Sequence, residues 1–132
     1  MDEVAASIAE GGEPFLVAVD GERVLGWAKL SRYSSRDYYA GVKEASIYVD
    51  AEARGRGVGR TLLAELEREA QRRGNWKLVG LVFPENAPSL SLFRAAGWRE
   101  VGFFHRHGVL DGRWRDVLLV ERSLGEAAAP GG

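Results

Sequence analysis

The sequence predicts an α/β (α+β) domain built on a mixed, mostly antiparallel twisted sheet that is flanked by helices. Two observations predict it: Asp-Gly pairs at 20–21 and 111–112 that each separate two apolar runs, and a strand–helix–strand pattern between positions 44 and 83. An Asp-Gly pair in this setting is typical of an antiparallel hairpin, whereas a helical crossover makes its two strands parallel. At 132 residues, 45% of them hydrophobic, the chain can form a single domain with its own core.

The first half of the chain alternates short apolar runs with turn signals. Asp2 to Ala9 has a weak helical pattern, and we expect the end of a helix there. Phe15 to Val19 and Val24 to Leu30 are expected to pair as a hairpin. The stretch from Ser31 to Gly41 is polar, aromatic and long for a connection, and such loops often carry function. Glu44 to Val49 alternates between two faces, which predicts a strand.

The second half contains the crossover and a second hairpin. From Val58 the apolar residues recur at helical spacing until Gly74, which predicts an amphipathic helix. Leu78 to Phe83 is a continuous apolar run, as expected of a strand covered on both faces. The remaining predicted elements are a short helix from Pro88 to Gly97 and two strands, Trp98 to Phe104 and Trp114 to Ser123. We interpret Trp98 and Trp114 as packing residues.

The composition excludes several kinds of site. The chain has no cysteine, which removes disulfides, thiolate zinc sites and cysteine nucleophiles, and with two histidines we expect no metal. A formal net charge of −1 gives no overall positive field, so we expect no nucleic-acid partner and no anionic membrane partner. The N-terminus lacks a signal-peptide pattern, and a cytoplasmic protein is the default expectation. Residues 1–124 are predicted to form one domain and 125–132 a flexible tail.

A glycine-rich turn between a predicted strand and the long helix is the most informative stretch. Its three glycines, at 55, 57 and 59, lack a Cβ. The backbone from Arg54 to Thr61 can therefore turn tightly and aim several N–H groups at one point, to which the helix dipole adds. The stretch lacks both the Gly-Lys-Ser/Thr ending of a Walker loop and the spacing of a dinucleotide fingerprint. We predict a phosphate-binding turn; the alternative is a plain strand-to-helix connection.

The order of elements and two motifs resemble the GCN5-related N-acetyltransferase (GNAT) superfamily. Residues 54–59 satisfy the acetyl-CoA signature Arg/Gln-x-x-Gly-x-Gly/Ala of that superfamily. Its second signature, an Asn followed by a short helix ending in Gly and an aromatic residue, matches 86–98. Segments 36–49, 84–89 and 108–117 are also similar to the phosphinothricin and methionine sulfoximine acetyltransferase subgroup. The resemblance covers roughly residues 14–124.

This resemblance implies an acetyl-CoA-dependent N-acetyltransferase. It implies direct attack of a primary amine, of a small amino acid or an analogue, on the thioester of acetyl-CoA. Glu44 would be the catalytic base, acting through water, and Arg36, Tyr39 and His107 would contact the acceptor. The residues expected to bind acetyl-CoA are Ile47, Tyr48, Val49, Arg54, Gly55, Arg56, Gly57, Val58, Gly59, Arg60, Thr61, Asn86, Ser89 and Phe93.

Two departures from the family pattern keep alternatives open. The family's first strand and helix would precede the segment that matches Phe15 to Val19, so both are expected to be missing from this chain. Phe93 stands where many members have a tyrosine that protonates the leaving thiolate. A catalytically silent CoA-binding or regulatory module and a protein N-terminal acetyltransferase are therefore alternatives. A histidine, His105 or His107, is an alternative base, and a homodimer is left open.

Overall fold

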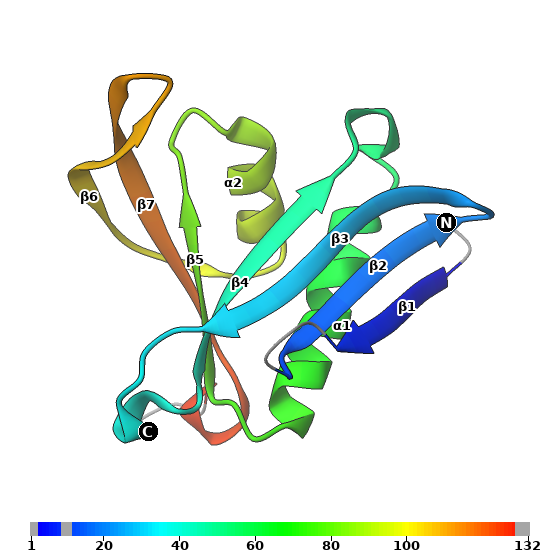
Figure 1. Cartoon of the computed structure of the whole chain (residues 1–132), viewed down its shortest axis with the longest axis horizontal. Helices are drawn as coiled ribbons and strands as arrows, with labels where there is room; N and C mark the ends of the chain where they lie inside the picture. Colours follow the sequence, from blue (N-terminus) through cyan, green and yellow to red (C-terminus); the bar gives the residue numbers. More distant parts are fainter. Residues whose placement is uncertain (1–2, 9–11, 129–132) are drawn as a thin grey trace.

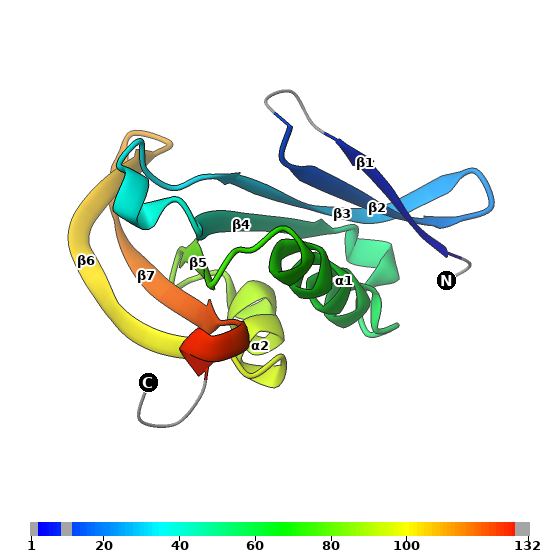
Figure 2. The ribbon, with the colours of Figure 1, turned by 90° about the horizontal axis from the view of Figure 1, so that it is seen from below.

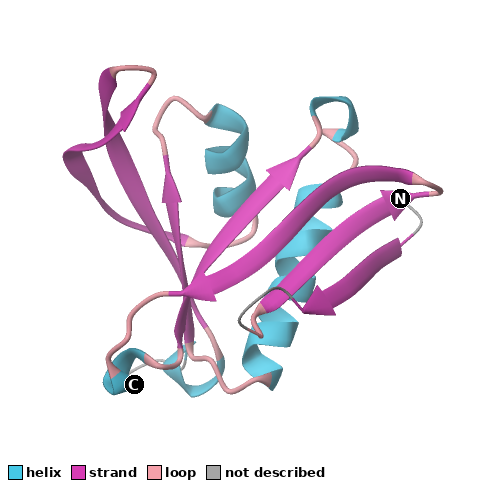
Figure 3. Ribbon diagram, in the orientation of Figure 1, coloured by secondary structure: helices cyan, strands magenta, loops and turns pink. Residues whose placement is uncertain are grey.

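The protein is a twisted seven-stranded sheet with two helices packed on one face (Figures 1 and 3). The computed structural model describes residues 3–8 and 12–128. Its strands and α-helices are β1 (Glu3–Ile8), β2 (Pro14–Asp20), β3 (Arg23–Arg32), β4 (Val42–Val49), α1 (Val58–Arg72), β5 (Lys77–Val82), α2 (Ala87–Ala95), β6 (Arg99–Leu110) and β7 (Arg113–Ser123). Three short 3-10 turns complete it: η1 (Asp37–Tyr39), η2 (Ala51–Ala53) and η3 (Gly125–Ala128).

The sheet topology confirms the predicted mixed, mostly antiparallel sheet. The strands lie in the order β1-β2-β3-β4-β5-β7-β6, and the β4–β5 pair is parallel while the other neighbours are antiparallel. The parallel ladder is short: it runs from Val42 opposite Lys77 to Glu44 opposite Val79. Beyond that pair β4 and β5 diverge (Figure 1). We call this point of divergence the fork.

The predicted helix at the N-terminus is wrong. Glu3–Ile8 forms β1, which pairs with β2 from Glu3 opposite Val19 to Ile8 opposite Pro14. A segment this short gains little from helix formation by itself, whereas the edge of β2 offers it a row of hydrogen-bonding partners. The sheet thus has a strand beside β2, although the resemblance implied that a first strand would be missing. The expected tail begins with η3, and 129–132 lie outside the described residues.

The core lies between the sheet and the two helices, which cover the same face (Figure 2). Leu62, Leu63 and Leu66 of α1 are fully buried in that core. The helical spacing of these apolar residues predicted this face correctly. No helix in residues 3–8 and 12–128 is long and apolar enough to cross a membrane.

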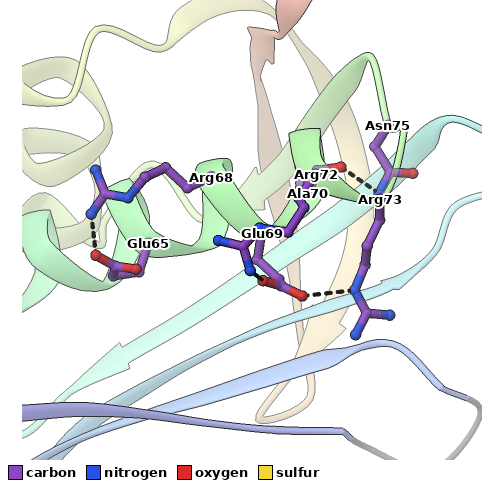
Figure 4. A network of polar contacts seen from close by, with 7 residues as sticks. All are labelled: Glu65, Arg68, Glu69, Ala70, Arg72, Arg73 and Asn75. Atoms are coloured by element: carbon purple, nitrogen blue, oxygen red, sulfur yellow. Dashed lines mark hydrogen bonds and ion pairs between the residues drawn. The ribbon is translucent and has the colours of Figure 1, made fainter.

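The exposed side of α1 is held by short-range ion pairs, and its end is capped (Figure 4). Glu69 accepts hydrogen bonds from Arg72 at 2.6 Å and from Arg73 at 3.0 Å, and Arg68 pairs with Glu65. Asn75 is buried, and both its backbone N–H and its side-chain amide donate to the carbonyl of Ala70. These bonds satisfy a carbonyl of the last helical turn and end the helix one turn before β5.

Candidate active site

A groove of about 510 Å³ opens at the fork, between the end of β4, the N-terminus of α1 and one side of α2. Its size is within the range of small-molecule sites. Because the β4–β5 ladder stops at Glu44, the β4 backbone beyond that residue has an edge without a strand partner on that side. The lining residues are Ile47, Tyr48, Val49, Ala53, Arg54, Gly55, Gly57, Val58, Gly59, Arg60, Asn86, Pro88, Ser89, Ser91, Leu92 and Ala95.

One wall of the groove is the glycine turn that leads into α1. Gly55 and Gly57 have φ values of +81° and +80°, in the left-handed region that glycine adopts without strain. Gly57 is the N-cap residue, and no side chain of the described residues caps the helix there. The first N–H groups of α1 are therefore directed out of the helix end beside the groove, where an anion would be stabilised. This matches the geometry that the sequence predicted for the turn.

The cationic and hydroxyl side chains of the turn divide into two groups. Arg54 and Arg60 line the groove and are exposed. Arg56 does not line it: its Nη2 lies 3.3 Å from Oδ2 of Asp20, at the end of β2. Thr61 does not line it either, because its hydroxyl donates to the carbonyl of Gly57 at 3.0 Å. Two of the four predicted polar side chains thus stabilise the turn instead of facing the groove.

An ion-pair cluster anchors the segment that carries the turn. Nη2 of Arg23 on β3 lies 2.9 Å from Oδ2 of Asp50 and 2.9 Å from Oε2 of Glu52. The hydrogen bond from Arg23 lowers the pKa of Asp50. The backbone N–H of Asp50 also donates to the carbonyl of Leu25 at 2.8 Å. The turn therefore starts from a point that is fixed to the neighbouring strand.

The opposite wall of the groove is α2. Asn86 is its N-cap residue, with Oδ1 accepting from the backbone N–H of Ser89 at 3.3 Å, and both residues line the groove as predicted. Sequence reasoning missed the other α2 lining residues, which are Pro88, Ser91, Leu92 and Ala95. Their spacing of three to four residues is the signal that could have found them, since it places them on one side of a helix.

Phe93 does not line the groove. Its side chain is buried beneath α2, with its ring centroid 4.8 Å from that of Trp98. A Cβ built on Gly80 of β5 would lie 3.4 Å from Phe93, so the ring packs directly onto the sheet. Helical rotation places Phe93 about 100° away from its neighbour Leu92, which does face the groove. The position therefore serves the core in this chain.

Glu44 lies at the fork itself. Its Cα partners are Ser31 on β3 and Val79 on β5, and this is the last pair of the parallel ladder. Ala45 belongs to the core under the helices, so alternation along β4 places Glu44 on the outer face, meaning the sheet face opposite α1 and α2. Tyr48, which lines the groove, is on that same outer face and stacks on Trp27 at 6.2 Å. Glu44 is half-buried.

Arg36, Tyr39 and His107, which the sequence suggested as acceptor contacts, are not among the groove-lining residues. The first two belong to the exposed loop before β4, about 23 Å along the strand from its groove end. Arg36 donates to the Tyr38 hydroxyl at 3.1 Å. His107 stacks on Phe104, with ring centroids 4.4 Å apart.

An irregularity in β6 breaks the expectation that the two histidines share one face. Residues 105–107 stand opposite the single residue Asp116, and Arg106 has a φ of +49°. His105 places Nδ1 3.1 Å from Oδ1 of Asp116, whereas His107 turns to Phe104. Among the residues that the structure describes, no group of three or more His, Cys, Asp or Glu side chains could hold a metal ion.

Comparison with known proteins identifies relatives with this arrangement. The profile of the acetyltransferase (GNAT) family matches residues 1–98. Phosphinothricin N-acetyltransferase of Alcaligenes faecalis is 35% identical over 90% of this chain and 61% of the relative. L-methionine sulfoximine/L-methionine sulfone acetyltransferase of Salmonella typhimurium is 34% identical over 90% of this chain and 70% of the relative. The chain thus spans less than two thirds of the Alcaligenes protein.

Solved structures show the same fold. A GNAT superfamily phosphinothricin acetyltransferase from Sinorhizobium meliloti, in complex with acetyl-CoA, superposes with a TM-score of 0.80 at 35% identity. The match covers 89% of this chain and 64% of that one.

Proposed function

Because the chain belongs to the acetyltransferase (GNAT) family, we propose that it is an acetyl-CoA-dependent N-acetyltransferase acting on the primary amine of a small amino acid or amino-acid analogue. The observation that carries the proposal is the fork, where an anion-binding helix end, an unpaired strand edge and a carboxylate meet. The relatives named for phosphinothricin and methionine sulfoximine support the acceptor class.

The groove offers separate contacts for the two ends of acetyl-CoA. The N–H groups at the start of α1, together with Arg54 and Arg60, would hold the pyrophosphate. The unpaired edge of β4 at Ile47–Val49 would hydrogen-bond the pantetheine arm as an added strand does, and Asn86 would contact the arm from α2. A backbone N–H of this edge is also the candidate donor to the thioester oxygen as negative charge develops there.

Glu44 would be the base. An alkylammonium has a pKa near about 10, so the amine must lose a proton before its lone pair can attack the thioester carbon. Glu44, at the base of the fork and on the outer face, would accept that proton through a water molecule. Collapse of the tetrahedral intermediate then breaks the C–S bond and releases CoA thiolate, which takes a proton from solvent. A thiol with a pKa near about 8.5 can leave in this form without an acid at Phe93.

Release of free thiol from acetyl-CoA in the presence of an amine panel tests this function. The proposal requires turnover with at least one small amino acid or analogue, together with CoA binding by calorimetry. One observation favours a second candidate, a catalytically silent CoA-binding module: the buried Phe93 leaves α2 without an acid at that position. That candidate predicts CoA binding without thiol release for every amine, peptide N-termini included.

We extend the proposal to a homodimer formed through the β6–β7 hairpin. This hairpin exposes six large apolar side chains, namely Val101, Phe103, Phe104, Val109, Leu110 and Trp114. Together they expose about 600 Å² of apolar surface, close to the roughly 800 Å² that each partner buries in a standard interface. Patches of this size on a monomer often mark an interaction site.

A further inference from the structure

Arg115 on β7 is a cation without a full set of partners. Its side chain is 23% exposed, the lowest fraction among the described arginines for which the structure shows an ion pair. Its Nε is buried and finds no hydrogen-bond acceptor within residues 3–8 and 12–128. The contact of Nη1 with Oε1 of Glu85, at 3.6 Å, is an ion pair that is too long for a hydrogen bond.

An arginine in this state is costly unless something else uses it. Burial removes water from the guanidinium, and a buried donor left without an acceptor loses the compensation that folding normally provides. Other arginines of the sheet are better satisfied: Arg99 reaches Glu121 at 2.6 Å, and Arg122 reaches Glu67 at 2.8 Å. Arg115 therefore retains donors for an additional anionic group.

The position of Arg115 connects it to the candidate active site. Glu85, its partner, directly precedes Asn86, which caps α2 and lines the groove. Opposite Arg115 on β6 is Gly108, which has no side chain to fill the space beside the guanidinium.

Arg115 also lies on the same sheet face as the proposed base. Glu44 pairs with Val79, and Val79 pairs with Glu121, so these three residues share the outer face. Every second residue of β7 from Glu121 back to Arg115 returns to that face. The extra residues of the irregular pairing are in β6, so they leave the alternation of β7 intact.

We propose that Arg115 binds the carboxylate of the amino-acid acceptor while the acceptor's amine lies at the fork. This inference rests on the proposed acetyltransferase function and names the group that its acceptor must carry. A guanidinium matches a carboxylate in both charge and planar geometry, and the buried Nε is a ready second donor for a bidentate contact. Arg36, which the sequence suggested for this role, is exposed in the loop before β4 and away from the groove.

The test compares two acceptors that differ in the carboxylate alone: L-methionine sulfone and 3-(methylsulfonyl)propylamine. We expect the wild-type protein to prefer the amino acid. Arg115→Met should raise KM for the amino acid about 10- to 100-fold and leave KM for the plain amine and the CoA affinity unchanged. Arg115→Lys should recover part of the loss, and Arg36→Met is the matched control that should change neither KM.

A purely structural role for the Arg115–Glu85 pair predicts a different pattern. Breaking the pair from either side would then have the same effect, so Glu85→Gln would match Arg115→Met. Our proposal instead expects Glu85→Gln to lower KM for the amino acid, because the competing carboxylate is gone. Equal losses in these two variants, or an unchanged KM in Arg115→Met, would overturn it.

The experiment separates this inference from the proposed function. If the wild-type protein binds CoA but acetylates no amine, the proposed function fails. Calorimetry of L-methionine sulfone with the CoA-bound protein then tests the anchor alone. Binding by wild type that Arg115→Met abolishes supports the carboxylate site, and absence of binding, or equal binding by both proteins, rejects it.

Discussion

Gly59 of α1 and Leu92 of α2 pack so closely that a Cβ built on Gly59 would lie 2.7 Å from Cδ2 of Leu92. The same Cβ would lie 3.3 Å from Val49, and all three residues line the groove. The glycine therefore sets the distance between the two helices where acetyl-CoA is proposed to enter.

Gly59→Ala should weaken CoA binding about 10-fold or more. The added methyl group must displace Leu92, which narrows the groove, and overpacking of this kind also destabilises a fold by about 1–3 kcal/mol. Calorimetric titration with CoA measures the first effect, and thermal unfolding measures the second. Gly74→Ala is the control: a Cβ there meets nothing within 4 Å, so strain from its φ of +88° should lower stability without changing CoA affinity. Equal CoA affinity in Gly59→Ala and wild type would contradict the assignment of the groove.

Arg60→Gln should weaken CoA binding and flatten its salt dependence. Arg60 lines the groove in the first turn of α1, where its charge adds to the helix dipole for a phosphate. We expect a loss of about 10-fold at low salt that shrinks as ionic strength rises. Arg72→Gln, at the other end of the same helix, is the matched control and should retain full affinity. A parallel loss in both variants would show that the effect is one of net charge.

Glu121 should make stability depend on pH in the acid range. Burial raises the pKa of Glu121, but Lys77 and Arg99 more than offset it, so the pKa is lowered overall. A lowered pKa gives stability that is complete above the unfolded value of about 4.3 and is lost as pH falls through the folded value. Unfolding midpoints of wild type and Glu121→Gln should thus differ most at pH 6–7, by about 2 kcal/mol, and converge at low pH. Glu22→Gln, an exposed change, should show no such trend; a constant difference at all pH values would refute the ionic explanation.

Trp114→Glu should convert the proposed dimer to a monomer. The indole is 64% exposed in the apolar patch of the β6–β7 hairpin, and a carboxylate buried there without a partner is strongly unfavourable. Sedimentation velocity across a concentration series measures the mass. Val24→Glu changes an exposed apolar residue elsewhere and should leave the dimer intact. A wild-type protein that stays monomeric at high micromolar concentration would exclude this interface.

The parts of the site that depend on local backbone geometry were predictable from sequence. Gly55 and Gly57 adopt the left-handed conformation that glycine favours, and Asn86 is a helix cap, so both signals act within a few residues. The β4 strand and the amphipathic α1 follow from periodicity for the same reason.

The features that depend on distant contacts were not predictable in this way. β1 forms because the edge of β2 is available, which the sequence of Glu3–Ile8 does not encode. Arg36 and Tyr39 are close to Glu44 along the chain, yet the length of β4 separates them from the groove. The extra residues of β6 broke the simple alternation that placed His105 and His107 on one face. Arg115 gave no signal of its own, because its unsatisfied Nε results from burial in the folded protein.

The most direct test of the central claim is a comparison of wild type and Glu44→Gln in the release of free thiol from acetyl-CoA. L-Methionine sulfone is the acceptor, and mass spectrometry identifies the N-acetyl product. Glu44 has its last ladder partner at the fork and no ion pair in the part of the chain that the structure describes, so the amide should fold and bind CoA as wild type does. We predict N-acetylation by wild type and a fall in kcat of about 100-fold or more in Glu44→Gln, partly recovered at high pH where the free amine is abundant. Absence of the N-acetyl product with wild type, or equal kcat in the two proteins, would contradict the account.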